Sequence, residues 1–153
     1  MTFSSDLNRI VKKTNSKFDK LFRFVTIEAL SSVVRLSPVG NPSLWQTKYP
    51  PTGYVGGRFR GNWQVSINQP ATSELNTFDK TGAATISKGT KEANQLKAGQ
   101  TSFVVNNLAY ARKLEYGGVG NGGSSQAPNG MVRITAARLK HSIKKEAARL
   151  NKK

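Results

Sequence analysis

The sequence predicts an α+β fold made of a long N-terminal helix, a small antiparallel sheet, a short middle helix and a basic C-terminal helix. Apolar residues recur every three or four positions over residues 5–36, as they do on one face of a helix. Residues 62–68 and 101–106 are short runs rich in β-branched and aromatic residues, which are typical of strands. Cations crowd residues 131–153, where an apolar stripe again has helical spacing. We expect a single domain over residues 1–153, because a chain of this length can bury a core without disulfides or metals.

The first helix is predicted from its regular apolar stripe. Asp6 lies in its first turn, where a negative charge complements the helix dipole. Ser37-Pro38 ends it, because the residue before proline is pushed out of the α region. A stripe this regular indicates core or subunit packing rather than a ligand site. It consists of Leu7, Val11, Thr14, Phe18, Leu21 and Val25, widened by Phe22, Ala29 and Val33.

The predicted strands are two short alternating segments. Trp63, Val65 and Ile67 fall on one face of the first, which indicates a half-buried strand of an antiparallel sheet. In the second strand, Phe103 and Val105 are expected on one side and Val104 on the other.

The middle helix is predicted over residues 82–97, with Ile86, Ala93 and Leu96 pointing inward. Gly89 weakens it, because glycine has a low helix propensity. Gly99 is expected to close it.

The last helix, predicted within residues 131–153, combines an apolar stripe with a cluster of Lys and Arg residues. The whole chain has a formal charge of +16, from 24 Lys and Arg against 8 Asp and Glu. Such an excess implies a polyanionic neighbour, either nucleic acid or an acidic protein surface. No aromatic residue interleaves with the cations, so base stacking on this helix is not expected. The predicted stripe is Val132, Ala136, Leu139, Ile143, Ala147 and Leu150, and the cations expected to face DNA or an acidic partner are Arg133, Arg138, Lys140, Lys144, Lys145 and Arg149.

Nothing in the sequence predicts catalysis, a cofactor or a metal site. The chain has no cysteine and one histidine, His141, and its eight acids show no pair at acid–base or metal spacing. Glu115 is the acid of most interest, and we expect it to form a structural ion pair near Arg112 and Lys113. No apolar run approaches the roughly 18 residues needed to cross a bilayer, and the N-terminus lacks the order of a signal peptide. We therefore expect a soluble, non-secreted protein that is not an enzyme.

The stretch from Thr101 to Arg133 is expected to act in assembly. The strand at 101–106 leads into helical turns around Tyr110–Glu115 and then into a glycine-rich loop that ends in Gln126-Ala127-Pro128. An exposed strand edge can pair with a neighbour's backbone. The loop can order on an adjacent subunit, with its entropy cost met only on assembly.

Four motifs, in order, resemble the neck and tail-completion proteins of tailed double-stranded DNA phages over roughly residues 30–150. They are Ser37-Pro38, then Gly57-Arg58-Phe59-Arg60-Gly61-Asn62-Trp63, then Asn106-Asn107-Leu108-Ala109-Tyr110-Ala111 with Leu114-Glu115-Tyr116-Gly117, and finally Gln126-Ala127-Pro128 with Gly130-Met131-Val132-Arg133. The chain departs from the family pattern by two longer loops, at residues 39–56 and 117–128. Within the first, Trp45, Tyr49 and Tyr54 are expected to pack on the domain or on a neighbouring chain.

The resemblance implies a structural protein of the virion neck or tail, made in the host cytoplasm. Such proteins assemble as rings, here expected to be hexamers, that complete the tail and join it to the head, and DNA passes through the opening. Expected partners are further copies, neighbouring neck, tail-terminator or tail-tube proteins and, non-specifically, viral DNA, with no membrane. The residues expected at subunit interfaces are Phe103, Val105, Tyr110, Glu115, Tyr116, Gln126, Pro128 and Met131.

Two alternatives remain at this stage. Charge alone favours a small, basic, non-specific nucleic-acid-binding protein, whose affinity for DNA should fall steeply with salt even as a monomer. A toxin or nuclease is disfavoured, because no histidine or carboxylate cluster is present.

Overall fold

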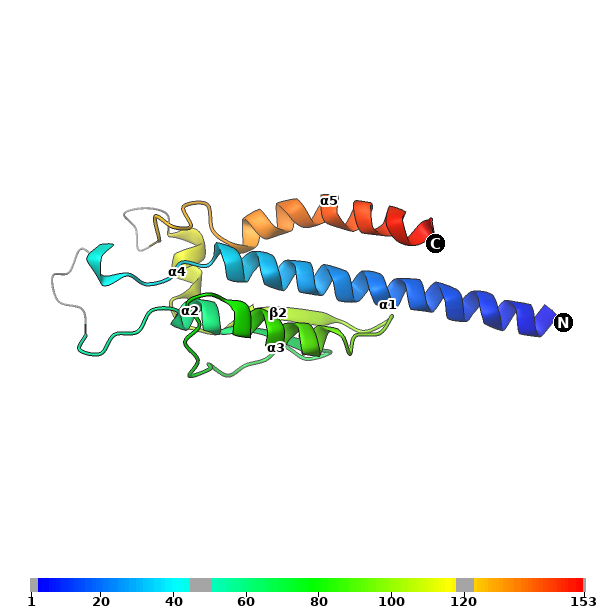
Figure 1. The fold of residues 1–153 in the computed structure, drawn as a ribbon, viewed down its shortest axis with the longest axis horizontal. Coiled ribbons are helices and arrows are strands. Elements are labelled where there is room, and N and C mark those ends of the chain that lie inside the picture. Colours follow the sequence, from blue (N-terminus) through cyan, green and yellow to red (C-terminus); the bar gives the residue numbers. More distant parts are fainter. Residues whose placement is uncertain (1–2, 45–50, 118–122, 153) are drawn as a thin grey trace.

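The predicted α+β class is confirmed by a computed structural model that describes residues 3–44, 51–117 and 123–152. The long N-terminal helix, the small antiparallel sheet and the basic C-terminal helix are all present, and further short helices lie between them (Figure 1). In chain order the elements are α1 (Phe3–Leu36), the 3₁₀ helix η1 (Pro42–Leu44), α2 (Arg58–Gly61), β1 (Trp63–Ile67), α3 (Ala83–Ala93), β2 (Ser102–Asn106), α4 (Ala111–Tyr116) and α5 (Val132–Asn151).

Helix α1 is the axis on which the other elements are arranged. Helix α5 runs antiparallel beside it, while the sheet and α3 pack on another side of α1 (Figure 1). The N-terminal part of α1 projects beyond the end of α5, and the two chain ends lie toward the same end of the molecule (Figure 1). Among the described helices, none combines the length and apolar character that a membrane crossing requires.

The two strands pair in the antiparallel sense, with Val65 opposite Val104 and Trp63 opposite Asn106. The predicted alternation of β1 is confirmed, since Trp63 and Val65 are buried and Ile67 packs against the core. On β2, Val104 packs against the same core, which places Phe103 and Val105 on the other face of the sheet.

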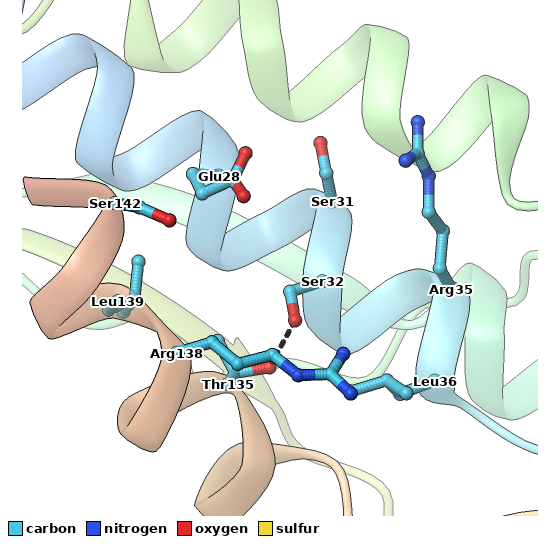
Figure 2. Close-up of a pocket in the computed structure, with 9 residues that line it drawn as sticks. All are labelled: Glu28, Ser31, Ser32, Arg35, Leu36, Thr135, Arg138, Leu139 and Ser142. Carbon is cyan, nitrogen blue, oxygen red and sulfur yellow. Dashed lines mark hydrogen bonds between the residues drawn. The ribbon is translucent and has the colours of Figure 1, made fainter. Parts of the chain in front are cut away.

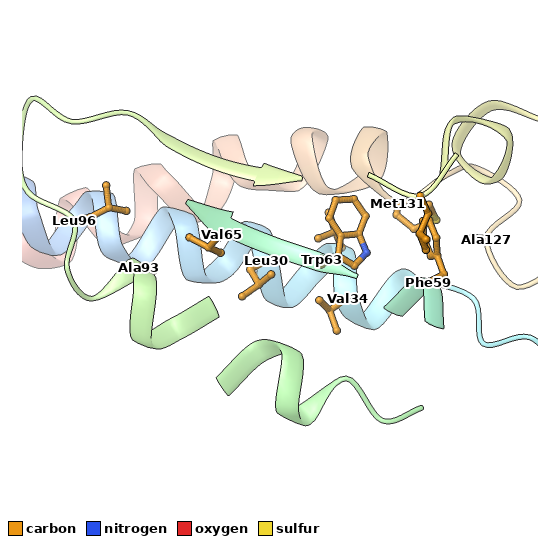
Figure 3. Packing of buried hydrophobic residues seen from close by; sticks show 11 residues of the cluster. Leu30, Val34, Phe59, Trp63, Val65, Ala93, Leu96, Ala127 and Met131 are labelled. Atoms are coloured by element: carbon orange, nitrogen blue, oxygen red, sulfur yellow. The ribbon is translucent and has the colours of Figure 1, made fainter. Parts of the chain in front are cut away.

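The hydrophobic core lies between the sheet, α3 and the second half of α1. Leu30 and Val34 of α1 are fully buried there, and Figure 3 shows Trp63 and Val65 of the sheet close to them. Met131, at the start of α5, extends this cluster toward Phe59 (Figure 3). Truncating one such residue to alanine typically costs about 2–5 kcal/mol.

Helix α3 is shorter than predicted. It ends at Ala93, and residues 94–95 form a turn, with Leu96 N donating to Ala93 O. The predicted inward residues are confirmed, because Ala93 and Leu96 are fully buried and Ile86 packs against the core. Gly99 lies well beyond the helix end, in a left-handed conformation before β2.

Gly89 has a packing role that its low helix propensity did not predict. A Cβ at this position would lie 2.3 Å from Leu30 Cδ2 and 3.0 Å from Val65 Cγ2. Glycine therefore lets α3 approach both α1 and β1 closely.

The predicted stripe of α5 matches the buried face only in part, since Leu150 is buried and Leu139, Ile143 and Ala147 are half-buried. Val132 and Ala136 are exposed, and the buried residues are Thr135, Glu146 and Leu150. Thr135 and Glu146 can be buried on α5 because each has a polar partner. Ser32 Oγ and Thr135 Oγ1 lie 2.7 Å apart in a hydrogen bond across the α1–α5 contact, and Glu146 pairs with Arg149 at 2.5 Å.

Candidate assembly surfaces

Ser37 joins three elements at the end of α1. Its hydroxyl donates to Val33 O at 2.6 Å and accepts from the Trp63 indole N–H at 2.7 Å. Its carbonyl accepts from Arg60 Nη2 at 2.6 Å. Ser37-Pro38 therefore does more than end the helix, because it fixes α1 to β1 and to α2.

The segment Gly57–Asn62 contains the short helix α2, directly before β1. Gly57 has φ of 97°, and a Cβ there would lie 2.7 Å from Asp79 C. A Cβ at Gly61 would lie 2.7 Å from Thr77 O. Asn62 continues the contact, since its Oδ1 accepts from Leu75 N at 2.7 Å. The two glycines allow residues 75–80 to pack directly on the α2 backbone.

Asp79, which lies in the segment that packs on α2, caps the N-terminus of α3. Its carboxylate accepts from Gly82 N at 2.7 Å, and from the backbone N–H and hydroxyl of Thr85 at 2.9 and 2.8 Å. Burial alone would raise the pKa of Asp79, but the hydrogen bonds from Thr85, Gly82 and Thr81 outweigh it and lower the pKa to about 2. Asp79 is therefore a buried structural carboxylate.

Glu115 caps α5 across 16–18 residues of sequence. Its carboxylate accepts from the backbone N–H groups of Met131, Val132 and Arg133 at 2.7, 2.9 and 3.0 Å. Burial would raise the pKa of Glu115, and these three hydrogen bonds and that of the Arg133 side chain lower it. The expected ion pair is present with a different cation, Arg133 at 3.3 Å.

The glycine-rich segment folds back on its own chain where it is described. The Gln126 amide accepts from Val39 N at 3.1 Å and donates to Val39 O at 2.9 Å. Ala127 is buried in the core. The loop thus ends in a fixed contact, while residues 118–122, which include part of the predicted arm, lie outside the described residues. Trp45 and Tyr49 do so as well, and Tyr54 is described and partly exposed.

The predicted interface residues divide into accessible and buried groups. Glu115 and Met131 are buried inside the chain, so in this conformation neither side chain can contact another subunit, and their predicted interface role is corrected to a structural one. Tyr110 is partly exposed and lies against Phe59, with ring centroids 5.9 Å apart. Tyr116 is 64% exposed, with the Arg133 guanidinium 5.1 Å above its ring. The remaining accessible positions are Phe103, Val105, Gln126 and Pro128.

The outer edge of β2 has backbone groups that the chain itself does not pair. Asn68 N donates to Thr101 O at 2.7 Å, which makes this a hydrogen-bonded pair of the ladder. Hydrogen-bonded and non-hydrogen-bonded pairs alternate, so the N–H and C=O groups of Ser102, Val104 and Asn106 point away from β1. Outside the ladder, no backbone hydrogen bond joins these three residues to another described segment.

The α5 cations are not all equally available. Arg133 and Arg149 pair with Glu115 and Glu146. Within the described chain, the other four predicted cations form no ion pair, and all are exposed: Arg138, Lys140, Lys144 and Lys145.

A polar cavity of about 220 Å³ lies between α1 and α5 (Figure 2). Arg35 and Arg138 come from opposite walls, and the hydrogen-bonded hydroxyls of Ser32 and Thr135 lie at the contact between the helices (Figure 2). Glu28 is the one acid in its lining. The cavity has no nucleophile paired with a base, and in the described part of the chain no three His, Cys, Asp or Glu residues gather as a metal site would require.

Comparisons with protein-family models, curated proteins and solved structures found no match to this chain.

Proposed function

We propose that this chain is a structural protein of the neck or tail junction of a tailed phage, where copies form a ring that completes the tail and joins it to the head. The open outer edge of β2 carries this proposal. It offers a neighbouring copy the unpaired backbone groups of Ser102, Val104 and Asn106, and the accessible Phe103 and Val105 lie on the outer face beside it. An added strand gains main-chain hydrogen bonds and contacts with alternate side chains.

The fixed structure around Ser37, Glu115 and Gln126 supports the proposal. The four motifs that resemble the phage family are internal ties at the end of α1, where β1, β2 and the start of α5 meet. A rigid edge loses little conformational entropy when a partner pairs with it. When the same edge contacts a different surface of the next copy, repetition closes a ring if the rotation permits.

The unpaired α5 cations give the ring a place for a polyanion. Arg138, Lys140, Lys144 and Lys145 would face the DNA in the opening or an acidic surface of an adjacent ring. The protein would act by assembly, with no catalytic step.

The edge contact can be tested with a proline at position 104. Val104→Pro removes an outward N–H while leaving the ladder to β1, and Val104→Ala is its matched control, since it loses a similar amount of packing and keeps the donor. Val105→Lys, with a charge beside the edge, is a second variant that does not touch the core-facing side. We expect wild type and Val104→Ala to form rings by negative stain and light scattering, and the other two to stay monomeric. Rings formed by Val105→Lys would overturn the edge contact.

The place in the virion needs particles made without the protein. Separate tails and filled heads are expected, with joining restored by the wild-type chain. Complementation by Lys140→Glu/Lys144→Glu/Lys145→Glu should fail, whereas Lys88→Glu/Lys91→Glu/Lys97→Glu, equally exposed near α3, should restore it. Intact particles without any copy of the protein would refute the junction role.

Non-specific nucleic-acid binding is the second candidate, favoured by the same unpaired cations. It predicts useful DNA affinity for the monomer, with a log–log salt slope of about −0.9 per neutralised phosphate. A ring component should lose that affinity when Val105→Lys keeps it monomeric.

A further inference from the structure

The N-terminal part of α1 carries an apolar stripe that the described chain leaves about half exposed. Its apolar positions follow a four-three spacing that continues into the part of α1 lying along α5. Leu7, Ile10, Val11 and Phe18 are 49%, 59%, 48% and 49% exposed, although each lies on or beside this stripe. In a globular protein, such an apolar stripe usually packs against the core.

The stripe becomes a groove where the end of α5 approaches it. A cavity of about 370 Å³ lies between the two helices, with Ile10, Phe18 and Leu21 on the α1 side and Ala147 and Leu150 on the α5 side. Lys13 and Lys17 line the same groove, four residues apart on one face of α1. The groove is therefore apolar and flanked by positive charge.

Among the described residues, no acid lines this groove, and Glu146, next to Ala147 on α5, pairs with Arg149. Asp6 pairs with Arg9 at 3.2 Å. Asp19 is held toward the α3–β2 connection, where its Oδ1 accepts from Ala98 N at 2.6 Å. The positive charge of Lys13 and Lys17 therefore favours a negatively charged partner in the groove.

We propose that this groove binds an acidic amphipathic helix of another protein. Such a helix would lie along α1 beside the last turn of α5, with an apolar seam on Ile10 and Phe18 and carboxylates against Lys13 and Lys17. The span from Leu7 to Phe18 is about 16 Å at 1.5 Å per residue, which sets a partner helix of about three turns. This mode of recognition, an amphipathic helix in an apolar groove, relies on side chains one turn apart.

The other occupants fit the groove less well. A second copy that packed its own groove here would bring its Lys13 and Lys17 against the same two lysines. A bilayer surface is flat on this scale, so it would not fit into the groove between α1 and the end of α5 at Ala147 and Leu150. Duplex DNA would use the lysines but gain nothing from Ile10, Phe18 and Leu21.

The test uses the full chain and two labelled synthetic helices of 18 residues, with the same leucine seam and either glutamates or lysines beside it. By fluorescence anisotropy at physiological salt we expect the glutamate helix to bind at least about tenfold more tightly than its lysine twin, equivalent to roughly 1.4 kcal/mol. Lys13→Glu/Lys17→Glu should reverse this preference. Lys88→Glu/Lys91→Glu, on the exposed face of α3, removes the same charge elsewhere and should preserve it.

Ile10→Ser/Phe18→Ser should abolish binding of the glutamate helix while leaving the circular dichroism spectrum unchanged, since both side chains are about half exposed. Equal affinity for the two helices, or an equal loss in the α3 variant, would overturn the proposal. The proposal would also be overturned if the glutamate helix failed to bind and the groove instead held another occupant. That occupant could be a second copy, an anionic phospholipid vesicle or duplex DNA, and Ile10→Ser/Phe18→Ser would abolish its binding. The proposal does not rest on the junction ring, because Val105→Lys monomers should still bind the peptide.

Discussion

The Trp63 indole N–H donates to Ser37 Oγ across 2.7 Å, and this bond connects the first residue of β1 to the residue that follows α1. Both residues are buried, so water cannot replace either partner. Because Ser37 also donates to Val33 O, the bond belongs to a short chain that ends on the α1 backbone.

Ser37→Ala should lower the free energy of unfolding by about 1–3 kcal/mol, because it leaves the Trp63 N–H buried without an acceptor. Ser31→Ala is the matched control, since Ser31 lies on the same helix in the lining of the polar cavity. Urea unfolding of the two variants checks this, and equal midpoints would contradict it.

Glu115→Gln should destabilise the protein by about 1–3 kcal/mol. The change removes the negative charge at the start of α5 and replaces one acceptor oxygen by an amide donor facing backbone N–H groups. Glu92→Gln makes the same substitution at an exposed acid and should change little. The measurement is the thermal unfolding midpoint, and an equal shift in Glu115→Gln and Glu92→Gln would show that the cap is unimportant.

Gly130→Ala should be more destabilising than Gly99→Ala. Both glycines have left-handed φ, 77° and 88°, so each alanine costs about 1–2 kcal/mol of backbone strain. At Gly130 the added Cβ would also lie 2.4 Å from Glu115 Oε1, whereas Gly99 has no atom within 4 Å. The difference between the two free energies of unfolding isolates the contact, and a larger loss in Gly99→Ala would refute it.

Stability should fall as pH drops from about 4 toward 2. The pKa of Asp79 is lowered in the folded state to about 2 from an ordinary 3.8, so the carboxylate favours folding above pH 4 and this contribution disappears as it protonates. Glu115 acts in the same direction. Urea midpoints at pH 7, 5 and 3 should show a shallower fall in Asp79→Asn than in wild type. Parallel curves would contradict a role for Asp79.

Patterns confined to one element predicted much of the fold. The α1 helix, its stop at Ser37-Pro38 and the alternation of Trp63, Val65 and Ile67 depend on local geometry, and the structure confirms them. The packing predicted for the α1 stripe is present only toward its C-terminal end, since Val33 is buried whereas Leu7, Val11, Phe18 and Phe22 are exposed. The buried face of α5 was predicted only in part, at Leu150. Thr135 and Glu146 are polar, and only the positions of Ser32 and Arg149 show that burying them leaves no group unsatisfied.

The candidate site was less predictable, because its contacts span long stretches of sequence. Glu115 had two nearby cations, and its actual partners lie at the start of α5. A Gln-Ala-Pro sequence gives no sign that Gln126 binds the backbone of Val39. The open groove on α1 was missed, because a regular stripe predicts packing without saying how much of it the chain itself covers.

Three of the eight acids, Asp79, Glu115 and Glu146, are buried, where they engage helix ends or Arg149. The outer surface is therefore more cationic than the overall composition suggests. During purification we expect the protein to carry host polyanions through low-salt columns, with an absorbance ratio that returns to that of pure protein only after a high-salt wash.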